Sequence, residues 1–84
     1  MNKNNIKTYN RIYQTPIKSD IVWTDIEALF LALGAEISEG RGSRVRIKLN
    51  NEMAVFHRPH PEKVTDKGAI KSVRKFLENA GVRL

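Results

Sequence analysis

Hydrophobic residues recur at helical spacing in three parts of the chain, and each part predicts an amphipathic helix. The three apolar faces consist of Ile6, Tyr9, Ile12 and Tyr13; of Ile26, Leu29, Phe30 and Leu33; and of Ile70, Val73, Phe76, Leu77 and Ala80. The second helix is expected to begin at a capping box formed by Thr24 and Glu27 and to stop at Gly34. Thr65 or Asp66 is expected to cap the third helix.

A different period, of two residues, runs from Arg44 to Leu49 and predicts a β-strand that is apolar on one face and basic on the other. Asn50-Asn51 predicts a tight turn, because asparagine tolerates positive φ, and residues 53–57 form the returning strand. This register places Arg44 directly opposite His57. It sends to the core the side chains of Val45, Ile47, Ala54 and Phe56.

With residues 35–38 as a further strand, the element order predicts an α+β fold: a three-stranded antiparallel sheet with helices on one face. The chain has 84 residues, enough for one domain with one small core. Because Gln14–Asp20 is the one linker candidate, residues 1–20 are expected to be a helical amino-terminal extension and residues 21–84 the domain. Aromatic side chains expected to pack in the core rather than stack on bases are Trp23, Phe30 and Phe76.

The charge of the chain is unevenly distributed. Fifteen Lys and Arg against nine Asp and Glu give a net charge of +6, yet residues 21–40 carry four acidic side chains and no basic one. This segregation favours an anionic partner on the basic side. The alternative is a solvated surface that only keeps the protein soluble.

Several classes of protein are excluded by what the sequence lacks. There is no cysteine, which removes disulfides and thiolate metal sites, and two histidines without a third ligand make a poor zinc site, so we expect no metal and no cofactor. The longest apolar run, from Ala28 to Leu33, is too short to span a bilayer. We therefore expect a cytoplasmic protein with no membrane partner.

The two histidines stand three residues apart in a proline-stiffened loop, His57-Arg58-Pro59-His60-Pro61, beside the basic strand. Metal-free RNA cleavage needs a group that takes the 2′-hydroxyl proton, a group that protonates the leaving oxygen, and cations that stabilise the phosphorane. His57, His60 and the strand arginines offer these parts. The simpler interpretation is that His57 is an ordinary strand-end residue and His60 an exposed loop residue. Gly40-Arg41-Gly42-Ser43 lacks the spacing of a phosphate loop and is better interpreted as a hairpin turn.

The chain resembles the HicA family of toxins from bacterial toxin–antitoxin pairs over about Trp23 to Val82. The resemblance rests on Gly42-Ser43-Arg44, the alternating strand, the Phe56-His57-Arg58-Pro59-His60-Pro61 loop and the Ala80-Gly81-Val82 end of the last helix. It implies a fold like the double-stranded-RNA-binding domain and a ribonuclease that cuts messenger RNA and blocks translation. It also implies neutralisation by a HicB-type antitoxin. The amino-terminal helix lies outside the resemblance and is expected to pack on the domain or to stabilise an oligomer, including one formed with the antitoxin.

The family usually places a catalytic histidine at or near the position that Arg44 occupies here. Because arginine stays protonated at neutral pH, either another residue acts as the base or the nuclease activity is weak or absent. We expect His57 to be the acid or base and His60 to transfer a second proton or shape the loop. The expected RNA-binding residues are Arg44, Arg46, Lys48, Arg58, Lys67 and Lys71. Two alternatives stay open: a module that binds RNA without cutting it, and a subunit whose basic face chiefly receives an acidic antitoxin.

Overall fold

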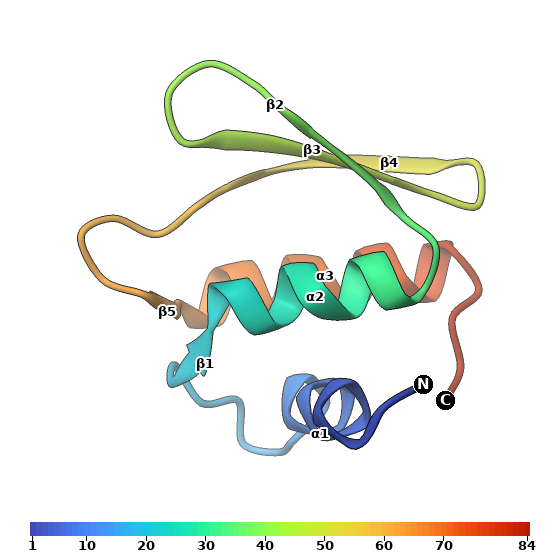
Figure 1. The fold of residues 1–84 in the computed structure, drawn as a ribbon. Coiled ribbons are helices and arrows are strands. Elements are labelled where there is room, and N and C mark those ends of the chain that lie inside the picture. Colours follow the sequence, from blue (N-terminus) through green and yellow to red (C-terminus); the bar gives the residue numbers. More distant parts are fainter.

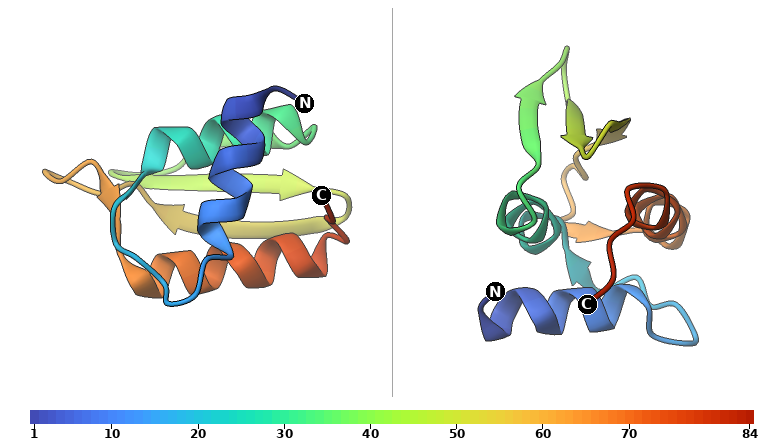
Figure 2. Two further views of the ribbon diagram at one scale, coloured as in Figure 1. Left: turned by 90° about the horizontal axis from the view of Figure 1, so that it is seen from below. Right: turned by 90° about the vertical axis from the view of Figure 1, so that its right-hand side faces the viewer.

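The computed structural model describes residues 1–84 and arranges them in three layers (Figure 1). The top layer is an antiparallel sheet in the order β2-β3-β4, formed by Glu36–Glu39, Arg44–Leu49 and Glu52–His57. Helices α2 (Trp23–Ala32) and α3 (Lys67–Asn79) cover one face of this sheet, and α1 (Lys3–Ile12) lies on the far side of the two helices (Figures 1 and 2). The predicted α+β class and the helices on one face are confirmed. No layer covers the outer face of the sheet.

The β3–β4 hairpin has the predicted register, with Arg44 opposite His57 and Leu49 opposite Glu52. Asn50 and Asn51 both have positive φ, 54° and 67°, as the right-handed twist of a two-residue hairpin requires. The predicted strand over residues 35–38 is observed one residue later, at Glu36–Glu39. Because the register is fixed, alternate side chains of β3 point to opposite faces of the sheet.

One cluster of 16 buried hydrophobic residues fills the space between the layers. At its centre are four aromatic rings, three from the helices α2 and α3 and one from the sheet: Trp23, Phe30, Phe76 and Phe56. Neighbouring rings have centroids 5.5–6.5 Å apart, in edge-on, tilted and stacked arrangements. The prediction that the aromatic side chains of α2 and α3 belong to the core is confirmed. Each buried ring contributes about 1.5–3 kcal/mol from apolar burial.

The predicted capping box at Thr24 and Glu27 is wrong. Helix α2 begins one residue earlier, at Trp23, and its N-cap residue Val22 makes no side-chain cap hydrogen bond. The reason is a short two-stranded sheet, β1 (Ile21–Val22) with β5 (Val64–Thr65), that delivers the chain into the helix. The backbone N–H of Trp23 donates to the Lys63 carbonyl oxygen at 2.9 Å. The Glu27 carboxylate does not cap the helix but accepts hydrogen bonds from the side chains of Arg58 and Trp23.

Strand β5 also decides how α3 begins. Thr65 lies in the strand and is buried, whereas the Asp66 carboxylate accepts a hydrogen bond of 2.7 Å from the Ala69 N–H. Of the two residues considered as caps, Asp66 is therefore the one that satisfies an unpaired donor of the first turn.

Helix α1 packs against the backs of α2 and α3 and contributes Ile12, which is fully buried, to the common core. Its buried side differs from the predicted one, because Asn5 and Thr8 face inward while Ile6 is 43% exposed. Arg74 of α3 holds the end of the helix: its Nε donates to the Ile12 carbonyl oxygen at 2.6 Å and its Nη2 to that of Gln14 at 2.8 Å. These bonds satisfy carbonyl groups that the end of a helix leaves unpaired.

Candidate nucleic-acid interface

Three cations stand in a row on the uncovered face of the sheet. Arg44, Arg46 and Lys48 alternate along β3 with the buried Val45, Ile47 and Leu49, so their side chains all point away from the core. The only ion pairs in the structure involve Arg11 and Arg58, so none of the three has a carboxylate partner. The row places three positive charges along one strand for an anionic chain to contact, with the carboxylate of Glu36 on β2 opposite Lys48 at one end.

His57 closes this row on the neighbouring strand. It is the last residue of β4, it is exposed, and it lies directly opposite Arg44. Side chains in such cross-strand positions have Cβ atoms about 4.5–5.5 Å apart. One phosphodiester group can therefore contact an imidazole and a guanidinium at once.

His60 lies in different surroundings. It is exposed in the loop between β4 and β5, where it lines a shallow pocket of about 370 Å³ together with Ser19, Glu62 and Asp66. His57 is not part of that pocket. The structure therefore does not bring the two histidines into one cavity.

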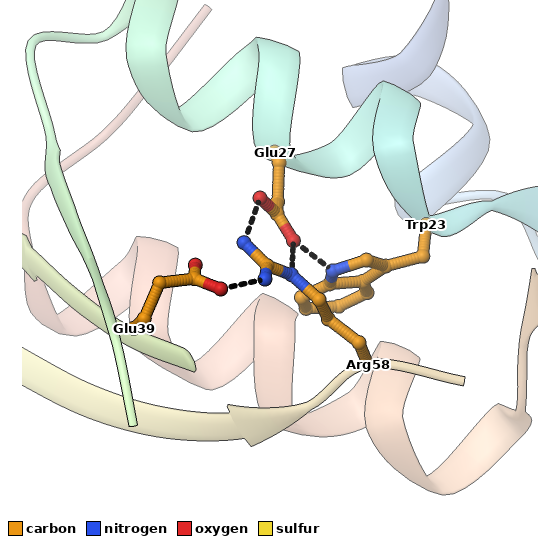
Figure 3. Close-up of polar contacts among 4 residues, drawn as sticks. All are labelled: Trp23, Glu27, Glu39 and Arg58. Atoms are coloured by element: carbon orange, nitrogen blue, oxygen red, sulfur yellow. Dashed lines mark hydrogen bonds and ion pairs between the residues drawn. The ribbon is translucent and has the colours of Figure 1, made fainter. Parts of the chain in front are cut away.

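Arg58 turns beneath the sheet rather than toward its outer face (Figure 3). Its Nε and Nη2 donate to the two carboxylate oxygens of Glu27 at 2.8 and 3.0 Å, and its Nη1 donates to Glu39 at 2.6 Å. The Trp23 indole N–H donates to the same Glu27 carboxylate. The bonds to Glu27 and Glu39 raise the pKa of Arg58, and the bond from Arg58 lowers the pKa of Glu39. A phosphate that approached Arg58 would have to compete with two carboxylates.

The backbone of Arg58 supports the outer face directly. Its N–H donates to the Ser43 carbonyl oxygen at 2.8 Å, joining the residue after His57 to the residue before Arg44. Together with its side-chain bonds to α2 and β2, this contact holds the opposed Arg44–His57 pair against the helical layer. The geometry gives Arg58 a positioning role for its neighbours.

Lys67 and Lys71 are exposed on α3, in the layer below the sheet. Because α3 packs against the inner face, these lysines do not share the outer face with the cations of β3 (Figure 1). The expected RNA-binding residues therefore divide into an outer group on β3, Arg58 beneath the sheet, and a pair on α3.

Sequence reasoning did not select Arg41, which joins the β3 arginines at the β2–β3 turn. A pocket of about 430 Å³ there is lined by Gly40, Val45 and Val55 together with three arginines and one carboxylate: Arg41, Arg44, Arg46 and Glu39. The sequence feature that could have identified Arg41 is its position between two glycines. In the structure Gly42 has a φ of +59°, and a Cβ on Gly40 would lie 3.0 Å from the Arg44 Cβ. The turn can approach β3 this closely because Gly40 has no side chain.

Nothing in the structure gathers a metal site, since no three His, Asp or Glu side chains form a group able to hold an ion. No helix is both long and apolar enough to cross a bilayer. What the site offers is an open antiparallel sheet with unpaired cations and one imidazole at its edge, which defines a small α+β domain suited to an anionic partner.

Comparison with known families agrees with this class of protein. The chain belongs to the HicA family: the family model described as HicA toxin of bacterial toxin-antitoxin matches residues 23–82. Toxins of this family are generally ribonucleases, and family membership implies a cognate antitoxin, generally HicB. Searches of curated proteins and of solved structures found no match. Helix α1 precedes the matched segment.

Proposed function

We propose that this HicA toxin is a metal-independent endoribonuclease that cleaves messenger RNA in the cytoplasm and thereby blocks translation. The single observation that carries the proposal is the pairing of His57 with Arg44 across the outer face of the sheet. The pairing supplies an imidazole and a permanent cation at one place, although Arg44 occupies the usual position of the family's histidine.

The chemistry follows from these groups. His57 takes the proton of a ribose 2′-hydroxyl, whose oxygen attacks the adjacent phosphorus, and the 5′ oxygen leaves with a proton from a second acid. Arg44 and Arg46 stabilise the negative charge of the phosphorane, because both are always protonated and neither is neutralised by a carboxylate. His60 is the candidate for the second proton transfer, or it shapes the loop. Lys48, Lys67 and Lys71 bind phosphates further along the RNA.

A HicB-type antitoxin neutralises this activity by covering Arg44, Arg46 and His57. Since RNA and antitoxin would share one surface, they exclude each other. Charge reversal at Arg44 and Arg46 should weaken both interactions, and unchanged antitoxin affinity in the Arg44→Glu, Arg46→Glu variant would argue against occlusion.

A second candidate function is RNA binding without cleavage. It is favoured by the arginine at the family's catalytic position and by the separation of His57 from the pocket that His60 lines. In that case the basic row holds phosphates, and translation is blocked by occupancy alone.

The test is incubation of the purified, partner-free protein with a long RNA in EDTA, followed by mapping of the new ends. We expect cleavage by the wild type, loss of cleavage in His57→Ala, and unchanged cleavage in Ser38→Ala, a matched control on the same outer face. Loss of cleavage in His60→Ala would assign His60 to the site, and unchanged cleavage would exclude it from the second proton transfer. Binding without new ends by the wild type would establish the second candidate instead.

A further inference from the structure

One edge of the sheet has backbone groups with no partner. In the β3–β4 hairpin the closing pair is Leu49 and Glu52, and the Arg58 N–H donates to the Ser43 carbonyl oxygen at 2.8 Å. Pairs that exchange hydrogen bonds alternate along an antiparallel ladder, so the even-numbered residues of β4 bond to β3. The backbone groups of Met53, Val55 and His57 therefore point away from the sheet.

This edge is also apolar and exposed. Met53 is 61% exposed and Val55 52% exposed. Both side chains lie on the outer face, Met53 opposite Lys48 and Val55 opposite Arg46. No turn or loop hydrogen bond engages the backbone of Met53, Val55 or His57. Natural sheets usually protect such an edge with charges or a covering segment.

The opposite edge differs. In β2 the outward backbone groups belong to Ile37 and Glu39, because the Gly40 N–H donates to the Arg44 carbonyl oxygen at 2.9 Å. Glu36 and Glu39 place negative charge along that strand. The two edges of the same sheet are thus unlike: β2 is acidic, and β4 is uncharged between its two ends.

The chemistry of the β4 edge fits a polypeptide as its binding partner. An added strand would satisfy the free N–H and C=O groups, and its alternate side chains would lie over the outer face. Apolar residues on that strand would cover Met53 and Val55, and acidic residues would meet the unpaired Arg46 and Lys48. Phosphates need only the cations, so RNA contact leaves the apolar pair and the backbone edge unexplained.

We infer that an extended acidic segment of the antitoxin adds to the sheet along the free edge of β4. The inference rests on the proposed neutralisation by an antitoxin and adds the strand, the edge and the chemistry of the docking segment. A strand in this place runs past the backbone of His57, so it closes the cleavage site while it binds.

Val55→Pro tests the inference with little change to the fold. Because the Val55 N–H faces outward, proline removes a donor to the partner and none to β3, and proline is accepted on strand edges in this orientation. Val55→Ile is the matched control, since it keeps the amide and the apolar side chain. Each variant is co-expressed with the cognate HicB-type antitoxin, and the affinity of the purified complex is measured beside a melting curve of the free toxin.

We expect Val55→Pro to weaken the complex about 10-fold or more and Val55→Ile to change it by about 3-fold or less. Hydrogen exchange on the wild type gives a second readout that no variant can confound. The amides of Met53, Val55 and His57 should gain protection in the complex, while those of Ile37 and Glu39 at the other edge should not.

An unchanged affinity in a folded Val55→Pro variant, or unprotected β4 amides in the complex, would overturn the inference while leaving neutralisation intact. Failure of the wild type to bind the antitoxin would remove the proposed neutralisation and this inference together. A toxin that pairs with itself along β4, seen as a dimer mass that Val55→Pro abolishes, would assign the edge to a second copy and also overturn it.

Discussion

The guanidinium of Arg58 binds both oxygens of the Glu27 carboxylate, with Nε 2.8 Å from Oε2 and Nη2 3.0 Å from Oε1. This two-point contact joins the end of β4 to the middle of α2, across 31 positions of the sequence. It fixes the orientation of the guanidinium as well as its place, because both groups are planar. His57, the preceding residue, is held at the rim of the outer face as a result.

We expect Glu27→Gln to lower the free energy of unfolding by about 1–2 kcal/mol, since it weakens two charge-assisted bonds at a site that is only partly open to water. Chemical denaturation measures the loss. Glu39→Gln is the control, because the Glu39 side chain is 70% exposed and solvent screens its pair with Arg58, so its loss should be clearly smaller. Equal losses in the two variants would contradict the greater importance of Glu27.

Acid should weaken the contact between Arg58 and Glu39. The hydrogen bond from Arg58 lowers the pKa of Glu39 below its ordinary value of 4.5, so the folded state binds this proton less readily than the unfolded chain. The resulting stability is present above pH about 4.5 and is lost as pH falls through the folded-state pKa. Melting temperatures between pH 7 and pH 3 should converge for the wild type and Glu39→Gln at the acidic end. Parallel curves would show that the carboxylate has no linkage to folding.

The alkaline side carries a separate prediction at the joint between α1 and α3. Burial, followed by the nearby Tyr9 and Glu78, raises the pKa of Tyr13 to about 12 despite the opposing effect of Arg74. A neutral phenol is therefore favoured in the folded state, and its contribution is complete below pH 10 and lost as pH rises toward 12. Absorbance titration of the Tyr9→Phe variant, in which Tyr13 is the remaining tyrosine, should show a midpoint clearly above 10, because burial is the largest cause of the shift, but below the wild-type value, because the contribution of Tyr9 is lost. A midpoint near 10 would mean that the phenol is free in solution.

Removal of the Ile12 side chain should expose how much α1 contributes. Ile12 is fully buried, so Ile12→Ala should cost about 2–4 kcal/mol and lower Tm by roughly 10 °C or more. Ile6→Ala is a matched change at an exposed position of the same helix, and we expect a loss below about 1 kcal/mol. Similar melting temperatures for the two variants would show that α1 is not packed as described.

RNA affinity should respond to the cations of β3 more than to those of α1. For single strands, each lost phosphate contact reduces the slope of log K against log salt by about 0.7, so Arg44→Ala with Arg46→Ala should reduce it by about 1.4. Lys3→Ala with Lys7→Ala removes the same charge from α1, the helix on the far side of the molecule from the sheet, and should leave the slope unchanged (Figure 1). Binding titrations at several salt concentrations provide the slopes, and equal reductions would indicate attraction by net charge alone.

The hairpin was predictable because every signal for it is local. Strict alternation from Arg44 to Leu49 and two asparagines in the turn fix both the register and the faces, and so place His57 opposite Arg44. The core sides of α2 and α3 followed from the helical spacing of their apolar residues in the same way.

What sequence reasoning missed depends on contacts between distant segments. The two residue pairs of β1 and β5 have no periodicity of their own, and they moved the start of α2 away from Thr24. Arg58 resembled any other basic loop residue, since its partners lie 31 and 19 positions earlier in the chain. The pattern of residues within one short segment contains no information about its contacts with a segment far away in the sequence.

Because α1 packs on the domain, the residues that share the hydrophobic core extend beyond the residues that match the family model. The family match begins at Trp23, but Ile12 and Ile21 precede it and belong to the same core as Phe30 and Leu77. A fragment trimmed to residues 23–82 would leave the backs of α2 and α3 bare and Arg74 without its carbonyl partners. The ends of the family match are therefore not the ends of the folding unit. A fragment for expression has to include α1, because α1 packs against the core.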